Sequence, residues 1–414
     1  MSRAVDQLVL PLMGDLSANE LTLELKPYIQ PFERVLASAE LAGLIPELQN
    51  ESLWTTQSPD VLQIRAGADL EHLSGRLAYW QRVGRENLSP TLQVLLEATD
   101  NGRGIGRMPT SRKLRYGPHD LHEYRGKFFP QLVRSLINFA GLRRGSLVLD
   151  PTCGSGTTNC EARVLGMRSV SLDLNPLSVL IARTKAGLIA ENPDRFDEGI
   201  SRFLELLDRS QGVNPESLWT EEELDYLLRW FAPEALSETA SIVRHIQRCT
   251  DEDTSRFLTV CLSNIVRGVS WQLESDLRVR KRVYDYTSGS TYERFTSEVQ
   301  RQRAKIEPYL RVLYDEQVET CPTPGDIRVG DARVIHNELR EYRGQCDALI
   351  TSPPYATALP YLDTDRLSLM VLRLLDRPSV RQREREMIGN REVSEKARAA
   401  LWEDFQRRCS ELPK

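Results

Sequence analysis

The fold is decided by the stretch SLVLDPTCGSGTTNCEARVLG, residues 146–166. Its apolar run predicts a buried strand, the two glycines after it predict a tight turn, and the segment from Thr157 to Gly166 has the pattern of a helix. The same order repeats at once, because RSVSLD (168–173) predicts a second strand and PLSVLIARTKAGL (176–188) a second helix. Strands and helices that alternate at this density indicate a parallel, doubly wound α/β sheet.

The turn after the first strand has the chemistry of a ligand site. Gly154 and Gly156 allow positive φ and close approach of a ligand, and free N–H groups at the start of the next helix favour an anion. Asp150 ends the first strand and Asp173 ends the second, where a carboxylate suits ribose hydroxyls. Asn159 takes the place of the third glycine of a dinucleotide fingerprint, which argues against a dinucleotide. The two acidic residues favour a nucleotide-like cofactor over a plain strand–helix turn.

The rest of the chain divides into further regions. Residues 1–110 contain helical periodicity and turns and predict a helical N-terminal region. Residues 111–191 contain the glycine turn and form the cofactor-binding half of the sheet domain. Residues 192–320 show helical patterns almost throughout and predict a large helical insertion. IRVGD and CDALIT then resume the strand pattern, so residues 321–414 form the second half of the sheet domain, with a helical tail.

Composition limits the class of protein. Apolar residues make up 40% of the 414 residues, and no run approaches the roughly 18–20 apolar residues of a membrane span. The N-terminal apolar stretch is too short for a signal peptide, and the seven cysteines are scattered without a zinc-type cluster. We therefore expect a cytoplasmic protein with no metal site and no membrane partner. Because the net charge is −5, a polyanionic partner would have to meet local positive charge.

A second motif, TSPPY (351–355), ends the strand predicted from CDALIT. Proline cannot extend a strand or donate a backbone hydrogen bond, and two prolines in a row stiffen the backbone. The motif therefore predicts a rigid loop with an aromatic ring just beyond the strand end. The alternative interpretation is an ordinary Pro-Pro loop with a packing tyrosine.

Together with EYRGKFFPQLVRSLI (123–137), these two motifs carry a resemblance to a known family. DPTCGSGTT is similar to the S-adenosylmethionine-binding motif of amino-methyltransferases that act on nucleic acids, and TSPPY is similar to their catalytic motif. The segment 123–137 resembles the one that precedes the glycine turn in many of them. The serine form of TSPPY resembles the DNA cytosine-N4 branch more than the adenine-N6 branch. The resemblance covers roughly residues 119–190 and 326–366 and implies a Rossmann-like class I methyltransferase fold.

The resemblance implies a cofactor role for each matching residue. Asp150 would orient the amino group of S-adenosylmethionine, Asp173 would accept hydrogen bonds from its ribose, and Asp331 would face its adenine. The residues that would surround the methionine moiety are Lys127, Phe128, Pro130, Thr152, Gly154 and Gly156. Asp331 also fits the N-cap of the helical segment ARVIHNEL, and the two roles are compatible.

The resemblance makes Ser352, Pro353, Pro354 and Tyr355 the catalytic residues. The exocyclic amine of cytosine or adenine is a poor nucleophile because its lone pair is delocalised into the ring. Ser352 Oγ and the Pro353 carbonyl would accept its hydrogen bonds and aim the lone pair. Tyr355 would stack on a base that has left the duplex.

Two segments carry the positive charge that a DNA partner requires. Residues 103–127 contain seven Lys and Arg residues against two acidic ones, and residues 267–305 contain nine against five. Aromatic residues alternate with positive charge in the second segment, which suits contact with phosphates and bases. The DNA-binding candidates are Arg278, Arg280, Lys281 and Arg282. The alternatives are a solvated charged face and, for 192–320, a structural cap in place of a target-recognition region.

The tail departs from the family pattern. The family's sheet continues with further strands after the catalytic motif, whereas the tail here shows helical periodicity and no convincing strand. The sequence therefore predicts no C-terminal strands, and we expect a truncated or split enzyme. A second subunit or another copy of the chain would complete the open sheet.

The leading hypothesis is an S-adenosylmethionine-dependent DNA methyltransferase that modifies an exocyclic amine, cytosine N4 before adenine N6. Its setting, by analogy only, would be restriction–modification or phage defence. The alternatives are an RNA methyltransferase and a non-catalytic or half-catalytic subunit that binds cofactor and DNA.

Overall fold

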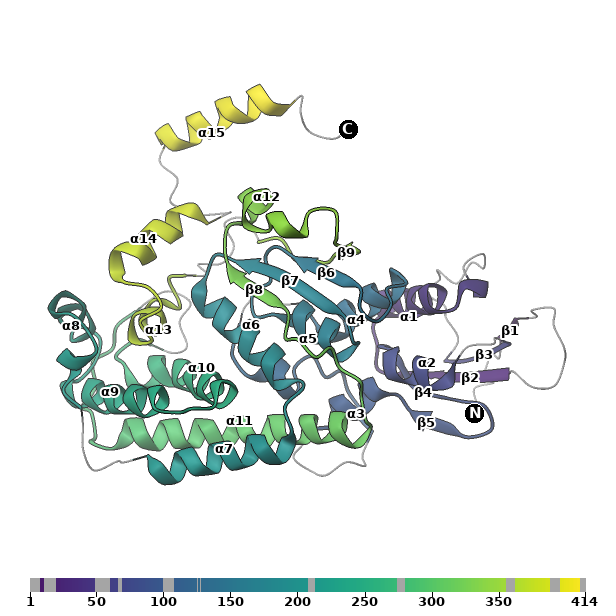
Figure 1. Cartoon of the computed structure of the whole chain (residues 1–414), viewed down its shortest axis with the longest axis horizontal. Coiled ribbons are helices and arrows are strands. Elements are labelled where there is room, and N and C mark those ends of the chain that lie inside the picture. The colour runs from purple at the N-terminus through teal and green to yellow at the C-terminus, as the bar shows by residue number, and fades with distance from the viewer. Residues whose placement is uncertain are drawn as a thin grey trace.

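A parallel sheet forms the centre of the chain (Figure 1). The computed structural model describes residues 8–10, 20–48, 60–65, 69–99, 108–124, 126, 128–207, 213–273, 280–354, 362–387 and 395–409. The strands of the central sheet are β6 (Leu147–Asp150), β7 (Arg168–Asp173), β8 (Asp326–Val329) and β9 (Ala348–Leu349). They lie in the order β8-β7-β6-β9, and all three pairings are parallel. The predicted parallel α/β sheet is therefore confirmed, and the arrangement is consistent with a Rossmann-like fold.

Long helices cover one face of this sheet and short helical turns cover the other (Figure 1). The first face carries α4 (Pro130–Phe139), α5 (Thr157–Val164) and α6 (Pro176–Leu188). The second carries η5 (Ala332–Val334), α12 (Ile335–Glu338) and η6 (Arg340–Tyr342). Val148 is buried in the cluster with α4 and α5, whereas its neighbours Leu147 and Leu149 pack with Leu339 on the opposite face. This alternation is the period of two that a strand with two covered faces requires.

The predicted helical insertion contains helices joined by irregular segments, and its described residues contain no named strand. Its elements are α7 (Pro193–Leu206), η4 (Pro215–Ser217), α8 (Glu221–Leu227), α9 (Pro233–Gln247), α10 (Glu252–Val269) and α11 (Ser290–Asp315). Asn192 and Asp251 accept hydrogen bonds from backbone N–H groups and cap α7 and α10. One apolar core runs from Ile181 of α6 to Phe257 of α10 and Phe295 of α11, so the insertion is packed onto the sheet domain.

The prediction of a purely helical N-terminal region is wrong. Five strands form a second sheet there, β1 (Leu8–Leu10), β2 (Glu20–Leu25), β3 (Val61–Arg65), β4 (Trp80–Gly84) and β5 (Leu88–Pro90), in the order β1-β3-β2-β4-β5. Its helices are α1 (Pro31–Leu44), α2 (Leu70–Arg76) and α3 (Leu92–Ala98), with η1 (Pro46–Leu48) after α1. Residues 69–83 have the apolar spacing of a single helix, but the helix ends at Arg76 and a strand begins at Trp80. Burial of Trp80 against Ala37 and Leu41 overrides the local helical pattern.

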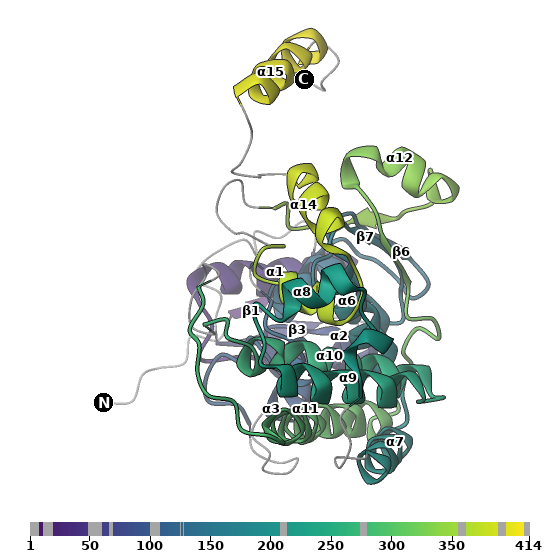
Figure 2. The same cartoon turned by 90° about the vertical axis from the view of Figure 1, so that its left-hand side faces the viewer.

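The tail is helical in the residues described, as predicted. It contains α13 (Arg366–Val371), α14 (Arg377–Glu386) and α15 (Glu395–Arg408). No strand follows β9 in the described part of the tail, and β9 is an edge of the sheet, with Leu349 58% exposed. Figures 1 and 2 both show α13 and α14 beside the body of the protein and α15 standing off from it. Among the described helices, none has both the length and the apolar character needed to cross a membrane.

Candidate functional site

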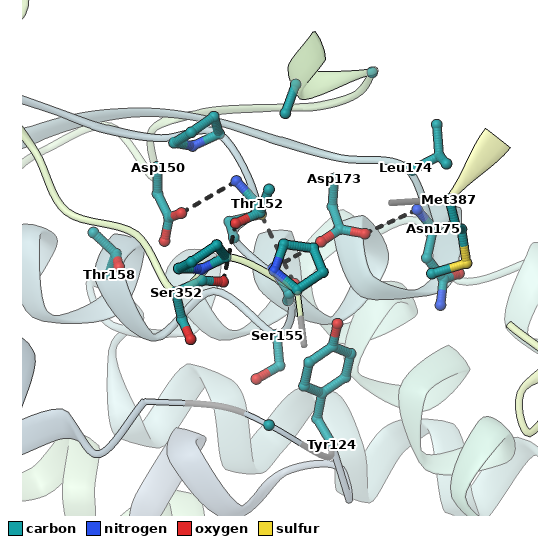
Figure 3. A pocket seen from close by; sticks show the side chains of 18 of the residues that line it. Tyr124, Asp150, Thr152, Ser155, Thr158, Asp173, Leu174, Asn175, Ser352 and Met387 are labelled. Atoms are coloured by element: carbon teal, nitrogen blue, oxygen red, sulfur yellow. Dashed lines mark hydrogen bonds between the residues drawn. The ribbon is translucent and has the colours of Figure 1, made fainter. Parts of the chain in front are cut away.

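A pocket opens at the carboxyl ends of β6 and β7 and beside the end of β9 (Figure 3). Its empty space amounts to about 880 Å³, including the part open to solvent. Three segments far apart in the sequence meet around it, the glycine turn, the Ser-Pro-Pro loop and the end of α14. The residues that line it are Tyr124, Gly126, Phe128, Asp150–Ser155, Thr157, Thr158, Asp173–Asn175, Gly330–Ala332, Ser352–Pro354, Glu386 and Met387.

The two glycines of the turn, Gly154 and Gly156, have different structural roles. Gly154 (φ +50°) lines the pocket, and a Cβ there would lie 2.7 Å from a ring carbon of Tyr124. Gly156 (φ +77°) is the N-cap of α5 and does not line the pocket. A Cβ at Gly156 would lie 2.5 Å from the Cβ of Ala182, so glycine is needed there for packing of α5 on α6. The need for glycine at position 156 therefore has a structural explanation, and the ligand contact predicted there stays a prediction.

Asp173 holds the turn in place from the end of the neighbouring strand. Its Oδ2 accepts a hydrogen bond from the Gly154 N–H at 2.8 Å, and its Oδ1 accepts one from the Asn175 N–H at 2.9 Å. Burial raises the pKa of Asp173 to about 6 against these hydrogen bonds, which favour the ionised form. Both carboxylate oxygens of Asp173 thus accept hydrogen bonds from backbone N–H groups, and the residue also lines the pocket (Figure 3).

Asp150 is the second buried carboxyl of the pocket and is only 2% exposed. Its Oδ1 accepts a hydrogen bond from the Thr152 N–H at 3.2 Å. Burial raises the pKa of Asp150 to about 6, opposed by the hydrogen bond from the Thr152 N–H. Together with Asp173 it gives the floor of the pocket an acidic character that suits a cationic ligand.

The catalytic motif predicted from sequence lies against the glycine turn. Ser352, Pro353 and Pro354 all line the pocket. Thr152 joins the two segments, since its Oγ1 lies 2.8 Å from Thr351 Oγ1 and donates to the Ser352 carbonyl at 3.1 Å. Tyr355, the fourth predicted catalytic residue, lies outside the described residues. The structure therefore brings three of the four together with the predicted cofactor residues.

The remaining cofactor candidates are placed differently from one another. Phe128 lines the pocket, whereas Pro130 is the first residue of α4, buried and away from the pocket lining. Lys127 lies outside the described residues. Asp331 lines the pocket and also caps η5, because its Oδ1 accepts a hydrogen bond from the Arg333 N–H at 2.9 Å. An ion pair of 2.6 Å with the Arg333 guanidinium lowers the pKa of Asp331.

Sequence reasoning missed several residues of the pocket. Tyr124 stands opposite the glycine turn, where its hydroxyl accepts a long hydrogen bond of 3.4 Å from Ser178 (Figure 3). It belongs to the segment EYRGKFF, whose aromatic content was the available signal. Glu386 and Met387 come from the tail, and no pattern in the sequence connects the tail to the glycine turn.

The DNA-binding candidates belong to the predicted insertion and are far in sequence from the glycine turn and the Ser-Pro-Pro loop. Arg280, Lys281 and Arg282 are exposed, and Arg278 lies outside the described residues. Lys281 pairs as an isolated bridge with Gln272, and its Nζ lies 4.8 Å from the centre of the Trp271 ring. The Lys281 ammonium group therefore lies at the surface and makes a cation–π contact with the Trp271 ring. In the first basic segment, Arg112 instead pairs with Glu33 at 2.7 Å and supports the contact with the N-terminal region.

Comparisons with known proteins agree with this geometry. A family model for the RMKL-like methyltransferase domain matches residues 121–188, which include Tyr124, the glycine turn and Asp173. The chain is 24% identical over 291 residues to the type II methyltransferase M.BsoBI of Geobacillus stearothermophilus, covering 61% of this chain and 52% of the relative. It is 23% identical over 308 residues to the type II methyltransferase M.MvaI of Kocuria varians, covering 70% and 65%.

A shorter match reaches a different class of relative. The tRNA (guanine(10)-N2)-dimethyltransferase of Methanothermobacter thermautotrophicus is 38% identical over 52 residues, which is 13% of this chain and 16% of that protein. The chain thus spans about half to two thirds of the type II relatives and a small part of the tRNA enzyme.

Proposed function

We propose that this chain, a member of the DNA methyltransferase family that uses S-adenosylmethionine, transfers the methyl group to an exocyclic amine of a DNA base. Cytosine N4 is the favoured acceptor and adenine N6 the second. One observation carries the proposal, the meeting of the glycine turn and the Ser-Pro-Pro loop in a single pocket with Thr152 hydrogen-bonded to both Thr351 and Ser352. The proposed setting is cytoplasmic restriction–modification or phage defence.

The residues of the pocket fit S-adenosylmethionine. The cofactor carries an amino group and a sulfonium, both cationic, and the pocket is lined by the carboxyl groups of Asp150, Asp173, Asp331 and Glu386. Gly154 and Tyr124 both line the pocket, and the Tyr124 ring packs directly against the glycine, where a larger residue would clash. In our proposal Asp150 holds the amino group, Asp173 the ribose and Asp331 the adenine.

When bound, S-adenosylmethionine would supply an electrophilic methyl group: the amine nitrogen would bond to its carbon as the carbon–sulfur bond breaks, the neutral thioether would leave, and the amine would lose one proton to solvent. The chain's own part is to orient that amine. Ser352 Oγ and the Pro353 carbonyl would accept its two hydrogen bonds, which directs the lone pair toward the pocket. The prolines hold these acceptors rigid before the base arrives, and such preorganisation lowers the barrier to transfer. Tyr355 would stack on the base.

The proposed DNA contact lies on the insertion. Arg280, Lys281 and Arg282 are exposed beside Trp271, and positive charge next to aromatic rings suits phosphates and unpaired bases. We propose that Arg278 extends this patch and that residues 192–320 contain the target-recognition region.

An RNA amino-methyltransferase is the second candidate. The match to the tRNA dimethyltransferase favours it, because that match has a higher identity than the type II matches. It covers only 13% of this chain, however, whereas the match to M.BsoBI covers 61%. The coverage therefore favours DNA.

Calorimetry followed by a transfer assay tests the proposal. S-adenosylmethionine is titrated into the protein, and tritiated methyl transfer is then measured on matched duplex DNA and RNA. We expect binding and transfer to DNA. Transfer to RNA alone would support the second candidate. Binding without transfer, restored by a second polypeptide, would support a half-catalytic subunit of a split enzyme, and absence of binding would refute the proposal.

A further inference from the structure

The end of α14 forms a wall of the pocket that lies outside the motifs recognised in the sequence. Glu386 and Met387 line the pocket together with Leu174 and Asn175. In Figure 3, Met387 lies at the same end of the pocket as Leu174 and Asn175, and Asp150 and Ser352 lie at the opposite end. The matched family segment ends at residue 188, so this wall comes from outside it.

α14 is fixed to the sheet by specific contacts. The Arg383 guanidinium donates to the Leu174 carbonyl at 3.0 Å, which ties the helix to the end of β7. Val380 is 2% exposed and joins the main core. The N-terminus of the helix is capped by Asp376, whose Oδ1 accepts from the Ser379 N–H at 2.8 Å. The position of Glu386 and Met387 at the pocket therefore follows from the helix that carries them.

The preceding helix, α13, strengthens the same attachment. Asp365, the N-cap of α13, accepts a hydrogen bond through Oδ2 from Nδ2 of Asn175, two residues after Asp173, at 3.0 Å. Ser368 Oγ donates to the Ser263 carbonyl of α10 at 3.3 Å, and Leu369 is fully buried. The part of the tail that contains α13 and α14 therefore supports the pocket.

The chemistry of this wall suits an adenine nucleoside. Met387 offers a flexible, polarisable thioether, which makes favourable contacts with aromatic rings. Gln382 Nε2 donates to Glu386 Oε1 at 3.0 Å and orients that carboxylate, and Asp331 lies on the same pocket. Carboxylate oxygens accept hydrogen bonds, so they favour the 6-amino group of adenine over the 6-oxo group of hypoxanthine or guanine.

We propose that the end of α14 is the specificity wall for the adenosine half of the ligand, with Met387 against the purine ring and Glu386 as an acceptor for its amino group. This inference rests on the proposed function, because it assumes that the pocket takes S-adenosylmethionine. It assigns the tail a binding role that the family motifs do not contain.

Binding of nucleoside fragments tests the assignment. Dissociation constants for 5′-methylthioadenosine and 5′-methylthioinosine are measured by calorimetry on the full chain and on Met387→Ala, Met387→Leu and Glu386→Gln. Arg385→Ala, an exposed change on the same helix that does not line the pocket, is the matched control. Thermal unfolding of each variant confirms that it is folded.

We expect Met387→Ala to weaken 5′-methylthioadenosine binding roughly three- to tenfold, Met387→Leu to restore most of it, and Arg385→Ala to change nothing. Glu386→Gln should reduce the preference for the adenine over the inosine compound, a ratio that a purely structural role would not alter. Unchanged affinities and an unchanged ratio in folded variants overturn this inference and leave the proposed function intact. If the unaltered chain binds neither S-adenosylmethionine nor 5′-methylthioadenosine, the proposed function itself fails.

Discussion

The two principal walls of the pocket are supported in different ways. The cofactor wall, residues 150–158 and 173–175, rests on β6 and β7, which pair with each other over four positions at the centre of the sheet. The catalytic wall, residues 351–354, follows β9, which pairs with β6 at two positions at the sheet edge. The cofactor wall is therefore supported by the two central strands, and the catalytic wall follows an edge strand.

Their internal bonding differs as well. The cofactor wall is closed by its own hydrogen bonds, from the Gly154 and Asn175 N–H groups to Asp173. The catalytic wall has its side-chain tie to the rest of the site through Thr152, which bonds Thr351 and Ser352. We therefore expect cofactor binding not to depend on the catalytic wall, whereas transfer requires both walls to be correctly placed.

The largest expected effect separates transfer from binding. Pro353→Ala loosens the loop that positions the acceptor carbonyl, and a misplacement of about 1 Å can cost on the order of a hundredfold in rate. We expect kcat to fall by about that factor with an unchanged dissociation constant for S-adenosylmethionine. Tyr355→Ala should behave alike through loss of base stacking. Pro322→Ala, in the loop before β8, is the control, and full activity of Pro353→Ala and Tyr355→Ala would break the distinction between the walls.

A change in the cofactor wall should have the opposite signature. Asp173→Ala leaves the Gly154 and Asn175 N–H groups without their acceptor, at a cost of roughly 1–3 kcal/mol for each unpaired group. The dissociation constant for S-adenosylmethionine should therefore rise roughly ten- to hundredfold, with a smaller change in kcat at saturation. Calorimetry measures the first and a saturated transfer assay the second. Asp404→Ala on α15 serves as a matched control, and wild-type affinity for Asp173→Ala would contradict the account.

The side-chain hydrogen bonds that join the two walls can be removed by one substitution. Thr152→Val removes the hydroxyl that bonds Thr351 and Ser352 but keeps the backbone N–H that bonds Asp150. Loss of a hydrogen bond worth about 0.5–1.5 kcal/mol predicts a kcat roughly two- to tenfold lower and a nearly constant affinity for S-adenosylmethionine. Thr259→Val on α10 is the control. A loss of affinity without loss of kcat would assign Thr152 to the cofactor, as the family motif implies.

The pH dependence should belong to the cofactor wall. In the free protein the pKa of Asp150 and Asp173 is raised to about 6 by burial, so both are ionised above that pH and protonated below it. A cationic ligand favours the ionised carboxylates, and its affinity should therefore rise by a few-fold as pH increases from about 5 to 7. The same raised pKa means that folding binds protons, so the free protein loses stability from these groups as pH rises between about 4 and 6. Calorimetry at several pH values checks this, and S-adenosylhomocysteine, without the sulfonium charge, should respond less.

The smallest effect on either wall is expected from the basic patch. Replacing Arg280, Lys281 and Arg282 by Ala should leave the affinity for S-adenosylmethionine unchanged. It should weaken DNA binding and lower its salt dependence by a slope of up to about 3, because each phosphate contact contributes roughly 0.9. Fluorescence anisotropy over a salt series measures this slope. An unchanged slope would assign these charges to an ordinary solvated face.

Local sequence signals were sufficient for the two walls. Strand, glycine turn and helix follow one another within residues 146–166, so periodicity and turn chemistry define the cofactor wall without long-range information. The double proline marks the catalytic wall in the same way. Gly156 shows the limit of such signals, because its need for glycine comes from Ala182 on α6, a neighbour in space and not in the motif.

Long-range packing explains what sequence reasoning missed. β2 and β3 pair across the intervening helix α1, and their alternating pattern extends over only five or six residues each, too little to outweigh the helical signals nearby. Met387 reaches the pocket because Val380 and Arg383 dock α14 on the body of the protein. Neither the pairing of β2 with β3 nor the docking of α14 could be predicted from the spacing of apolar residues in the sequence.

The most direct test of the central claim is the identity of the methylated nucleoside. Unmethylated plasmid DNA is incubated with the full chain and S-adenosylmethionine, digested to nucleosides and analysed by mass spectrometry. The account predicts a methyl group on an exocyclic amine, as N4-methylcytosine or, second, N6-methyladenine, which disappears with Pro353→Ala. Methylation at a ring carbon, as in 5-methylcytosine, or DNA that stays unmethylated by a chain that binds S-adenosylmethionine would contradict it.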